Sequence, residues 1–177
     1  ERALEGIQTL VGNECRRLMG ESETVFDKNK HDKLIQIGHE KAGQGTVEES
    51  LKLLTEWVHR ATGQKPMLFL DEYDVPIHSI YLSQDYDRFI EFIRNFLSSG
   101  LKDNDHLDRA LLTGILRVSK ESIFTGLNNF AVYGLNDRLY SSYFGFTEEE
   151  VSRILIDFHL EEQLPGVKRW YNGYLFG

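Results

Sequence analysis

The stretch Lys65-Pro66-Met67-Leu68-Phe69-Leu70-Asp71-Glu72-Tyr73-Asp74 decides the fold of this chain. Its four consecutive apolar residues lead directly into Asp71 and Glu72, and Asp74 follows two positions later. A short apolar run that opens at a proline and closes at acids is typical of a buried parallel strand. In open α/β sheets, ligands bind at the carboxyl ends of such strands. The stretch therefore predicts an α/β fold with a site beside these acids.

The same stretch has the Walker B form, in which an apolar strand ends in two adjacent acids. In P-loop nucleotide hydrolases, one acid holds magnesium and the other acts on the attacking water. This pattern predicts that Asp71 binds Mg²⁺ through water and that Glu72 orients or deprotonates the attacking water. The phosphate loop ending in Gly-Lys-Ser or Gly-Lys-Thr has no candidate in the 177 residues. The chain has the features of half of a nucleotide site.

Composition favours a globular protein of a reducing compartment. The chain is 41% hydrophobic and 27% charged, which suits one domain with a sizeable core. Its formal net charge of -8 gives no global field that would attract nucleic acid or an anionic membrane. No apolar run approaches the roughly 20 residues that span a bilayer. The one cysteine, Cys15, favours core packing over a disulfide or a nucleophile. We expect a cytoplasmic domain without a membrane partner, and, because residue 1 is not Met, a piece of a longer protein.

We expect a single domain over residues 1–177 in three parts: a helical part at 1–62, the strands at 63–140, and a helix with an aromatic segment at 141–177. The periodicity predicts a first helix over residues 2–20. Residues 21–45 are rich in polar and turn-forming side chains and predict a loop with at most a few helical turns. Thr46 and Glu49 have capping-box spacing and predict the start of a helix that ends at Gly63.

Beyond the acids, Val75-Pro76-Ile77 predicts the start of a connection, followed by an amphipathic helix over residues 84–99 that breaks at Gly100. Residues 110–115 are again apolar and predict a second strand. A right-handed crossover makes two such strands parallel, so their carboxyl ends open on one edge of the sheet.

This geometry predicts one cleft that holds the acids of the first strand together with two residues of the second. These residues are Asp71, Glu72, Thr113 and Arg117.

The C-terminal part predicts smaller elements. We expect a short helix around residues 122–124, a turn at Gly126, Asn128 and Asn129, and a short strand near residues 130–135. Thr147 and Glu150 form a second capping box ahead of another helix, and the aromatic stretch 170–176 predicts a hairpin or a strand edge.

Four ordered blocks of the sequence resemble a known family. They are LFLDEYDVPI, LLTGILRVSKESIFTGLNNF, YFGFTEEEV and WYNGYLFG, and they cover roughly residues 50 to 177. In this order they resemble the AAA-ATPase-like domain of a large prokaryotic family, which is often followed by a PD-(D/E)XK nuclease-like domain.

This resemblance implies a P-loop NTPase fold, with a three-layer α/β/α arrangement of parallel strands, ATP and Mg²⁺ as cofactors, and a phosphate loop upstream. It implies that Thr113 lies at a sensor-like strand end and that Arg117 reports on the γ-phosphate. The chain departs from the family by lacking the Walker A strand, which leaves sheet edges unpaired. We therefore expect this piece alone to be inactive and to form an oligomer or a strand swap. ATP hydrolysis would switch an attached nuclease-like or partner-binding domain, so nucleic acid would be involved only indirectly.

Other interpretations stay open. Asp71 and Glu72 are alternatively solvated loop acids, Asp74 is a helix cap or a weaker metal ligand, and Arg117 is alternatively a partner of a carboxylate. The whole chain is alternatively a non-catalytic interaction or signalling scaffold. A third alternative is a metal-dependent nuclease that uses Asp71, Glu72 and Asp74 directly, since clustered acids can hold two magnesium ions.

Overall fold

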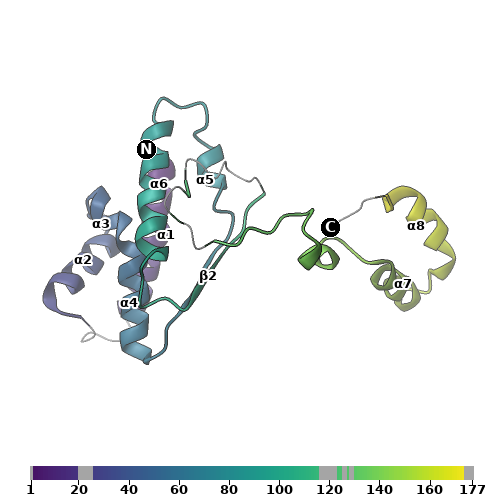
Figure 1. The fold of residues 1–177 in the computed structure, drawn as a ribbon, viewed down its shortest axis with the longest axis horizontal. Coiled ribbons are helices and arrows are strands. Elements are labelled where there is room, and N and C mark those ends of the chain that lie inside the picture. The colour runs from purple at the N-terminus through teal and green to yellow at the C-terminus, as the bar shows by residue number, and fades with distance from the viewer. Residues whose placement is uncertain (1, 20–25, 116–122, 125–126, 128–129, 174–177) are drawn as a thin grey trace. The chain divides into compact units, whose positions relative to one another are not determined.

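Figure 1 shows a computed structural model of the chain, which describes residues 2–19, 26–115, 123–124, 127 and 130–173. The chain divides into two compact units, Glu1–Asn129 and Phe130–Gly177, and each is described by itself. None of the helices that the structure describes is long and apolar enough to cross a membrane.

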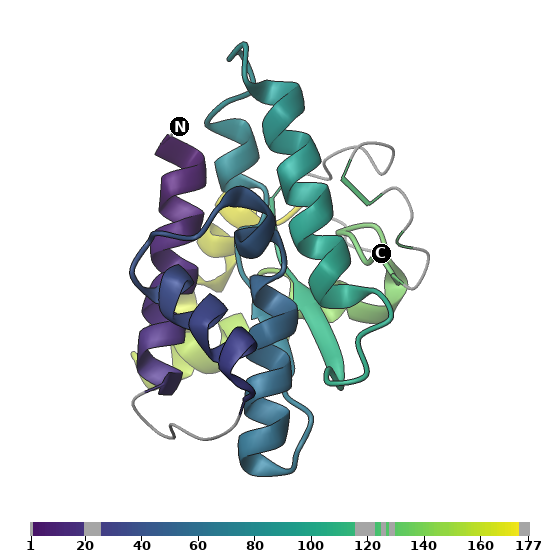
Figure 2. The same cartoon turned by 90° about the vertical axis from the view of Figure 1, so that its left-hand side faces the viewer.

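The first unit combines helices with a small sheet. Its elements in chain order are α1 (Arg2–Met19), α2 (Lys28–Gly38), α3 (Gln44–Glu48), α4 (Ser50–Thr62), β1 (Met67–Leu70), α5 (Val75–His78), α6 (Tyr86–Leu101) and β2 (Arg109–Leu112). Helices α1 and α2 pack on each other, and α4 packs on α6. Figures 1 and 2 both place α4 and α6 on one side of the sheet. The buried apolar face of α6 forms most of the core there, with Phe92 and Phe96 stacked at a centroid distance of 5.8 Å.

The sheet of the described residues has two strands, β1 and β2, which pair in parallel. Met67 lies opposite Arg109 and Leu70 opposite Leu112. The parallel pairing predicted from the crossover is confirmed. The structure is consistent with an α/β fold, but the described part is mostly helical and does not have three layers.

One face of this sheet is exposed, contrary to the expectation of a buried strand. Met67 and Leu111 are each 54% exposed and Phe69 is 65% exposed, whereas the alternate positions face the helices and are half-buried. When a sheet is covered on one face only, exposed and buried residues alternate along each strand. The uninterrupted apolar run predicts cover on both faces, and the described residues supply it on one.

The helix α2 occupies residues 28–38 of the loop predicted over residues 21–45. Asp27 caps it, because its side chain accepts a hydrogen bond of 3.1 Å from the backbone N–H of Lys30. Leu34 and Ile37, three positions apart, are buried. The polar residues that indicated a loop form the solvent face of an amphipathic helix.

The capping box predicted at Thr46 and Glu49 is absent, because Thr46 lies inside α3 and Glu49 lies between α3 and α4. The Glu49 carboxylate instead binds Lys33 of α2 at 2.7 Å. The predicted stop at Gly63 is confirmed: Gly63 has a φ of +72° and its N–H donates to the carbonyl of His59 at 2.8 Å. The helical region therefore begins earlier than the capping signal indicates, at Gln44 after the N-cap Gly43, whereas the glycine ends α4 as predicted.

The connection predicted to start at residues 75–77 contains the short helix α5. The expectation at the end of α6 is wrong. Gly100 does not end α6 but lies inside it, where a Cβ atom would come within 2.6 Å of the Cβ of Leu51. This glycine is present because α4 and α6 approach closely, which a sequence pattern does not distinguish from a helix stop.

The second unit is built of short helices. Its elements are η1 (Arg138–Tyr143), α7 (Glu148–Asp157), η2 (Glu161–Gln163) and α8 (Leu164–Tyr171), where η marks 3₁₀ helices. The second capping box is confirmed, since the Thr147 side chain accepts from the N–H of Glu150 and the Glu150 carboxylate accepts from the N–H of Thr147.

Other predictions for this part are wrong. Residues 130–135 are not a strand, and Trp170 and Tyr171 end a helix instead of forming a hairpin. Pro165 at the start of α8 fixes a backbone angle suited to the first helical turn. The residues 174–176 of the aromatic stretch, the Gly126 and Asn128–Asn129 turn, and Ser122 of the predicted short helix lie outside the described residues.

Candidate functional site

The candidate site begins at the turn that follows β1. Asp71 accepts a hydrogen bond of 3.0 Å from the backbone N–H of Glu72, and Glu72 has a φ of +53°. A glutamate in this left-handed region is uncommon and is held there by its surroundings. The Glu72 carbonyl then accepts from the N–H of Val75 at 3.1 Å, which leads the chain into α5. The turn leaves the side chains of Asp71 and Glu72 exposed at the carboxyl end of the strand.

The end of β2 meets this turn. The Thr113 hydroxyl donates a hydrogen bond to Oδ1 of Asp71. Two backbone bonds fix the same contact: the Thr113 N–H donates to the carbonyl of Leu70 at 2.9 Å, and the Tyr73 N–H donates to the carbonyl of Thr113 at 3.0 Å. The structure therefore brings together Asp71, Glu72 and Thr113, three of the four residues expected in one cleft.

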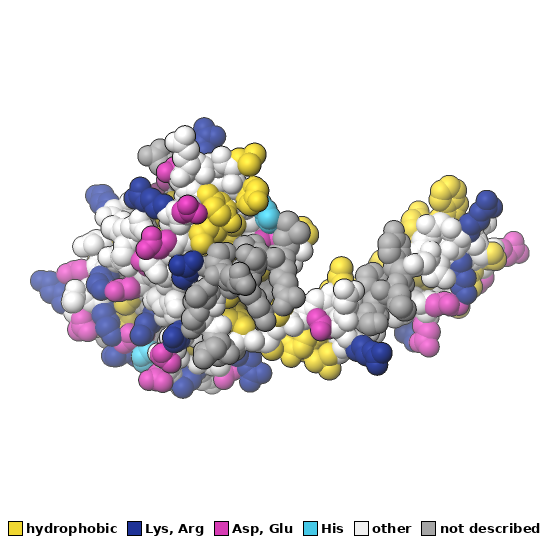
Figure 3. Space-filling view, turned by 45° about the horizontal axis from the view of Figure 1, so that its top comes forward, with side chains coloured by type: hydrophobic (Ala, Val, Ile, Leu, Met, Phe, Trp, Pro, Cys, Tyr) yellow, Lys and Arg dark blue, Asp and Glu magenta, His cyan; other side chains and the backbone are white. Residues whose placement is uncertain are grey.

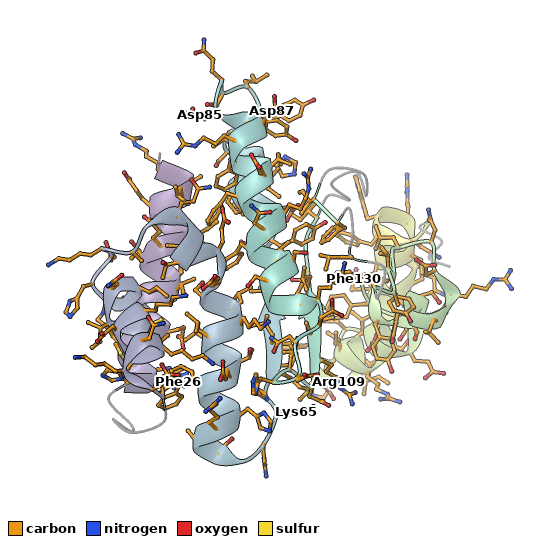
Figure 4. The ribbon with its side chains drawn as sticks, turned by 60° about the vertical axis from the view of Figure 1, so that its left-hand side comes forward. Phe26, Lys65, Asp85, Asp87, Arg109 and Phe130 are labelled. Atoms are coloured by element: carbon orange, nitrogen blue, oxygen red, sulfur yellow. The ribbon has the colours of Figure 1, made fainter. Side chains whose placement is uncertain are left out.

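Figure 4 shows the orientation of the strands through two labelled residues. Lys65, just before β1, and Arg109, the first residue of β2, lie at the same end of the sheet. The acids and Thr113 follow the opposite, carboxyl ends of both strands. The site thus lies at the edge where open α/β sheets bind ligands.

Asp74 is separated from the exposed acids, because its side chain is only 2% exposed. Its Oδ2 accepts a hydrogen bond of 3.1 Å from the backbone N–H of Ile115, and Nε2 of His78 lies 3.6 Å from the same oxygen. It occupies the residue before α5 but makes no side-chain capping bond. Asp74 is therefore at the expected N-cap position of α5, and the weaker metal-ligand role stays a prediction.

Arg117, Asn128 and Asn129 lie outside the described residues. Among the residues that the structure describes, no group of three His, Cys, Asp or Glu side chains is placed to hold a metal ion. The directly metal-bound nuclease site made of Asp71, Glu72 and Asp74 therefore has no support in this geometry.

Sequence reasoning missed the contribution of Gly114. A Cβ atom at this position would lie 2.7 Å from Oδ1 of Asp74 and 2.8 Å from Cε1 of Tyr73. The Tyr73 ring also contacts Phe124 edge-on at a centroid distance of 5.5 Å. The Thr-Gly pair directly after an apolar strand was the available signal, because a glycine there permits close approach of a second backbone.

Charged side chains elsewhere in the first unit join its helices to one another. Burial by itself raises the pKa of the Glu56 carboxyl, but the hydrogen bond and charge of Lys30, with the charges of Arg60 and His106, outweigh burial and hold this pKa below its ordinary value. Lys30 Nζ lies 2.6 Å from Oε1 of Glu56 and joins α2 to α4. In Figure 3 the visible surface of the first unit carries acidic and basic side chains side by side. The acidic and basic side chains on this surface are mixed and do not form a patch of one charge.

The exposed acids and the threonine provide only oxygen ligands. Mg²⁺ prefers such ligands and usually keeps several waters while it binds one or two carboxylates. Asp71, which accepts the Thr113 hydroxyl, fits a magnesium ion that is held through water. The side chain of Glu72 is exposed, so it can contact solvent.

Comparisons of the sequence with known proteins identify the family of the chain. Residues 5–124 match the sequence model of the AAA-ATPase-like family, described as "Predicted AAA-ATPase". An uncharacterized protein in the vnfD 5′ region of Azotobacter chroococcum mcd 1 is 37% identical over 128 residues, which cover 68% of this chain and 23% of that protein. No solved structure matches the chain. The family match includes both strands, the acids and Thr113, and on this ground the chain belongs to the AAA-ATPase-like family.

Proposed function

We propose that this chain supplies the magnesium-binding and water-activating half of an ATP hydrolysis site. The observation that carries the proposal is the junction of the two strand ends, where Thr113 bonds to Asp71 and the turn presents Glu72. A magnesium ion bound there would neutralise charge on the transferring phosphoryl group. Asp71 would hold the waters of that ion, Thr113 would fix the rotamer of Asp71, and Glu72 would orient the attacking water.

Arg117 completes the proposed set. It follows Thr113 by four residues and would place its guanidinium on the γ-phosphate, where a cation stabilises the charge of the transition state.

The exposed face of the sheet supports the presence of a further segment in the complete site. Parallel sheets are normally covered on both faces, yet Met67, Phe69 and Leu111 are more than half exposed. We propose that a segment with the phosphate loop pairs beside β2 and that the chain continuing from this segment covers the exposed face. Without it, the open edges would favour a homo-oligomer or a strand swap.

We further propose that hydrolysis switches an attached nuclease-like or partner-binding domain. The relative from Azotobacter is longer than this chain, which covers 23% of it, so other domains are available in at least one similar protein. Nucleic acid would be touched by that domain and not by this chain.

One observation favours a second candidate function, a scaffold that does not hydrolyse ATP. Oδ1 of Asp71 accepts bonds from both the Glu72 N–H and the Thr113 hydroxyl, and such contacts alone explain an aspartate at a turn.

The experiment that separates the two compares ATP turnover in the full-length protein and its variants. We expect Glu72→Gln to keep ATP binding within roughly threefold while turnover falls by roughly 100-fold or more, the range for loss of a general base. The matched control is Asp87→Asn, an exposed acid at the start of α6 that Figure 4 shows away from the strands. A wild type without turnover above background would support the scaffold instead, whereas measurable turnover that is equal in the wild type and in Glu72→Gln would refute the role of Glu72.

A further inference from the structure

The segment that follows β2 is held by hydrogen bonds more than by side-chain packing. Ile115 has a side chain that is 87% exposed, Gly114 has none, and Thr113 is exposed. Packing of these side chains therefore does little to fix the segment, and its place depends on hydrogen bonds. Thr113 has the backbone bonds to Leu70 and Tyr73 described above, and beyond it the bond from Ile115 to Asp74 continues the junction.

Of the three acids in the run, Asp74 is the one whose carboxylate accepts the hydrogen bond from the Ile115 N–H. It is 2% exposed and lies under Gly114, whose missing Cβ leaves the space that Oδ1 occupies. A buried carboxylate is unfavourable unless hydrogen bonds compensate for lost hydration, and a bond from a backbone N–H to a charged acceptor is among the stronger ones. A residue this costly to bury, at a point where any apolar side chain would fill space, indicates a role in positioning.

We propose that Asp74 is a positioning residue that locks the Thr113–Ile115 segment onto the turn holding Asp71 and Glu72. It acts by accepting the Ile115 N–H, so it fixes the chain at the point where it leaves the second strand. The role rests on the proposed ATPase function, but the lock itself is a structural statement about this chain. Asp74 does not touch metal or nucleotide in this scheme.

The lock accounts for two residues that lie beside the Asp74 carboxylate, Gly114 and His78. Gly114 is required because a side chain there would collide with Asp74 and Tyr73. His78, one turn along α5, has a side chain that is 43% exposed, and its Nε2 lies 3.6 Å from the carboxylate. Loss of the lock would leave Asp71 and Glu72 in place and free residues 113–115, which directly precede the proposed phosphate-sensing part of the sequence.

The test compares Asp74→Ala with Asp74→Asn in the full-length protein. Asparagine keeps the shape and an oxygen acceptor for the Ile115 N–H, whereas alanine removes the acceptor. For Asp74→Ala we expect kcat to fall by about tenfold or more with KM for Mg-ATP within about threefold, because small misplacements of catalytic groups cost rate more than binding. Asp74→Asn should stay within about threefold of the wild type in both constants. Hydrogen–deuterium exchange of peptides covering residues 113–115 should rise in Asp74→Ala only.

Three results would overturn the proposal: an unchanged kcat and unchanged exchange in Asp74→Ala, a loss carried by KM alone, or equal damage in Asp74→Asn. If the wild type does not hydrolyse ATP, the proposed function fails, and the exchange measurement decides the lock by itself. If Asp74→Ala does not fold, Gly114→Ala takes its place. It should displace the same segment and give the same split between kcat and KM, and an unchanged kcat in that variant would overturn the proposal.

Discussion

Gly100 tests the packing of the first unit, because α4 and α6 meet at its Cα. An added Cβ would lie 2.6 Å from the Cβ and 3.0 Å from Cδ1 of Leu51. Carbon atoms pack best at about 3.5 to 4.0 Å, so the two helices must separate by roughly 1 Å. Such overpacking costs about 1 to 3 kcal/mol, and the better helix propensity of alanine returns about 1 kcal/mol. Because the clash involves a backbone-proximal atom and not a flexible tip, we expect Gly100→Ala to lower the free energy of unfolding by about 2 kcal/mol.

The matched control is Gly6→Ala in α1, where an added Cβ meets nothing within 4 Å. This variant gains helix propensity without a clash, so the free energy of unfolding should rise by about 0.5 to 1 kcal/mol. Both variants are measured by urea denaturation, followed by circular dichroism at equal protein concentration. Equal stabilisation by the two substitutions would refute the close approach of α4 and α6.

Other predictions concern charge, reactivity and capping. Glu56→Gln should lower the free energy of unfolding by about 1 to 2 kcal/mol at pH 7. Because the pKa of Glu56 in the folded protein lies below its ordinary value, this difference between wild type and variant is complete above about pH 5 and disappears as the pH falls through the folded pKa. Denaturation at several pH values would measure it. Burial raises the pKa of the Cys15 thiol to about 12, so Ellman's reagent should fail to react with it at pH 8 until the protein is unfolded, and fast reaction with native protein would contradict its burial. Thr147→Ala removes the cap of α7 and should destabilise that helix by about 1 kcal/mol, seen as faster amide exchange in residues 148–151 and absent if the cap contributes nothing.

The elements that could be predicted from the sequence are those with a strong local signal. The run from Met67 to Leu70 and the left-handed stop at Gly63 need no tertiary information, and both are confirmed. Gly100 and Glu49 show the limit of this reasoning. Each has a residue type that normally marks a helix boundary, but each makes a contact with a neighbouring helix instead. Gly100 allows the close approach of Leu51, and the Glu49 carboxylate binds Lys33.

The candidate site was predictable as far as its topology. Parallel strands place their carboxyl ends together, so the meeting of Asp71 and Thr113 follows from chain order alone. The separation of Asp74 from the other two acids did not follow, because it depends on the left-handed turn at Glu72 and on the bond to Ile115. Spacing gives the order of side chains along a turn but not which of them is buried.

The central claim is that Asp71 and its neighbours form the metal-binding half of an ATP site. The most direct measurement is calorimetric titration of the full-length protein with ATP, with and without magnesium, for the wild type and Asp71→Ala. The account predicts magnesium-dependent binding by the wild type and a loss of roughly tenfold or more in affinity in the variant, as removal of a metal-supporting carboxylate gives. Binding that is equal in the two proteins, or independent of magnesium, would contradict the account.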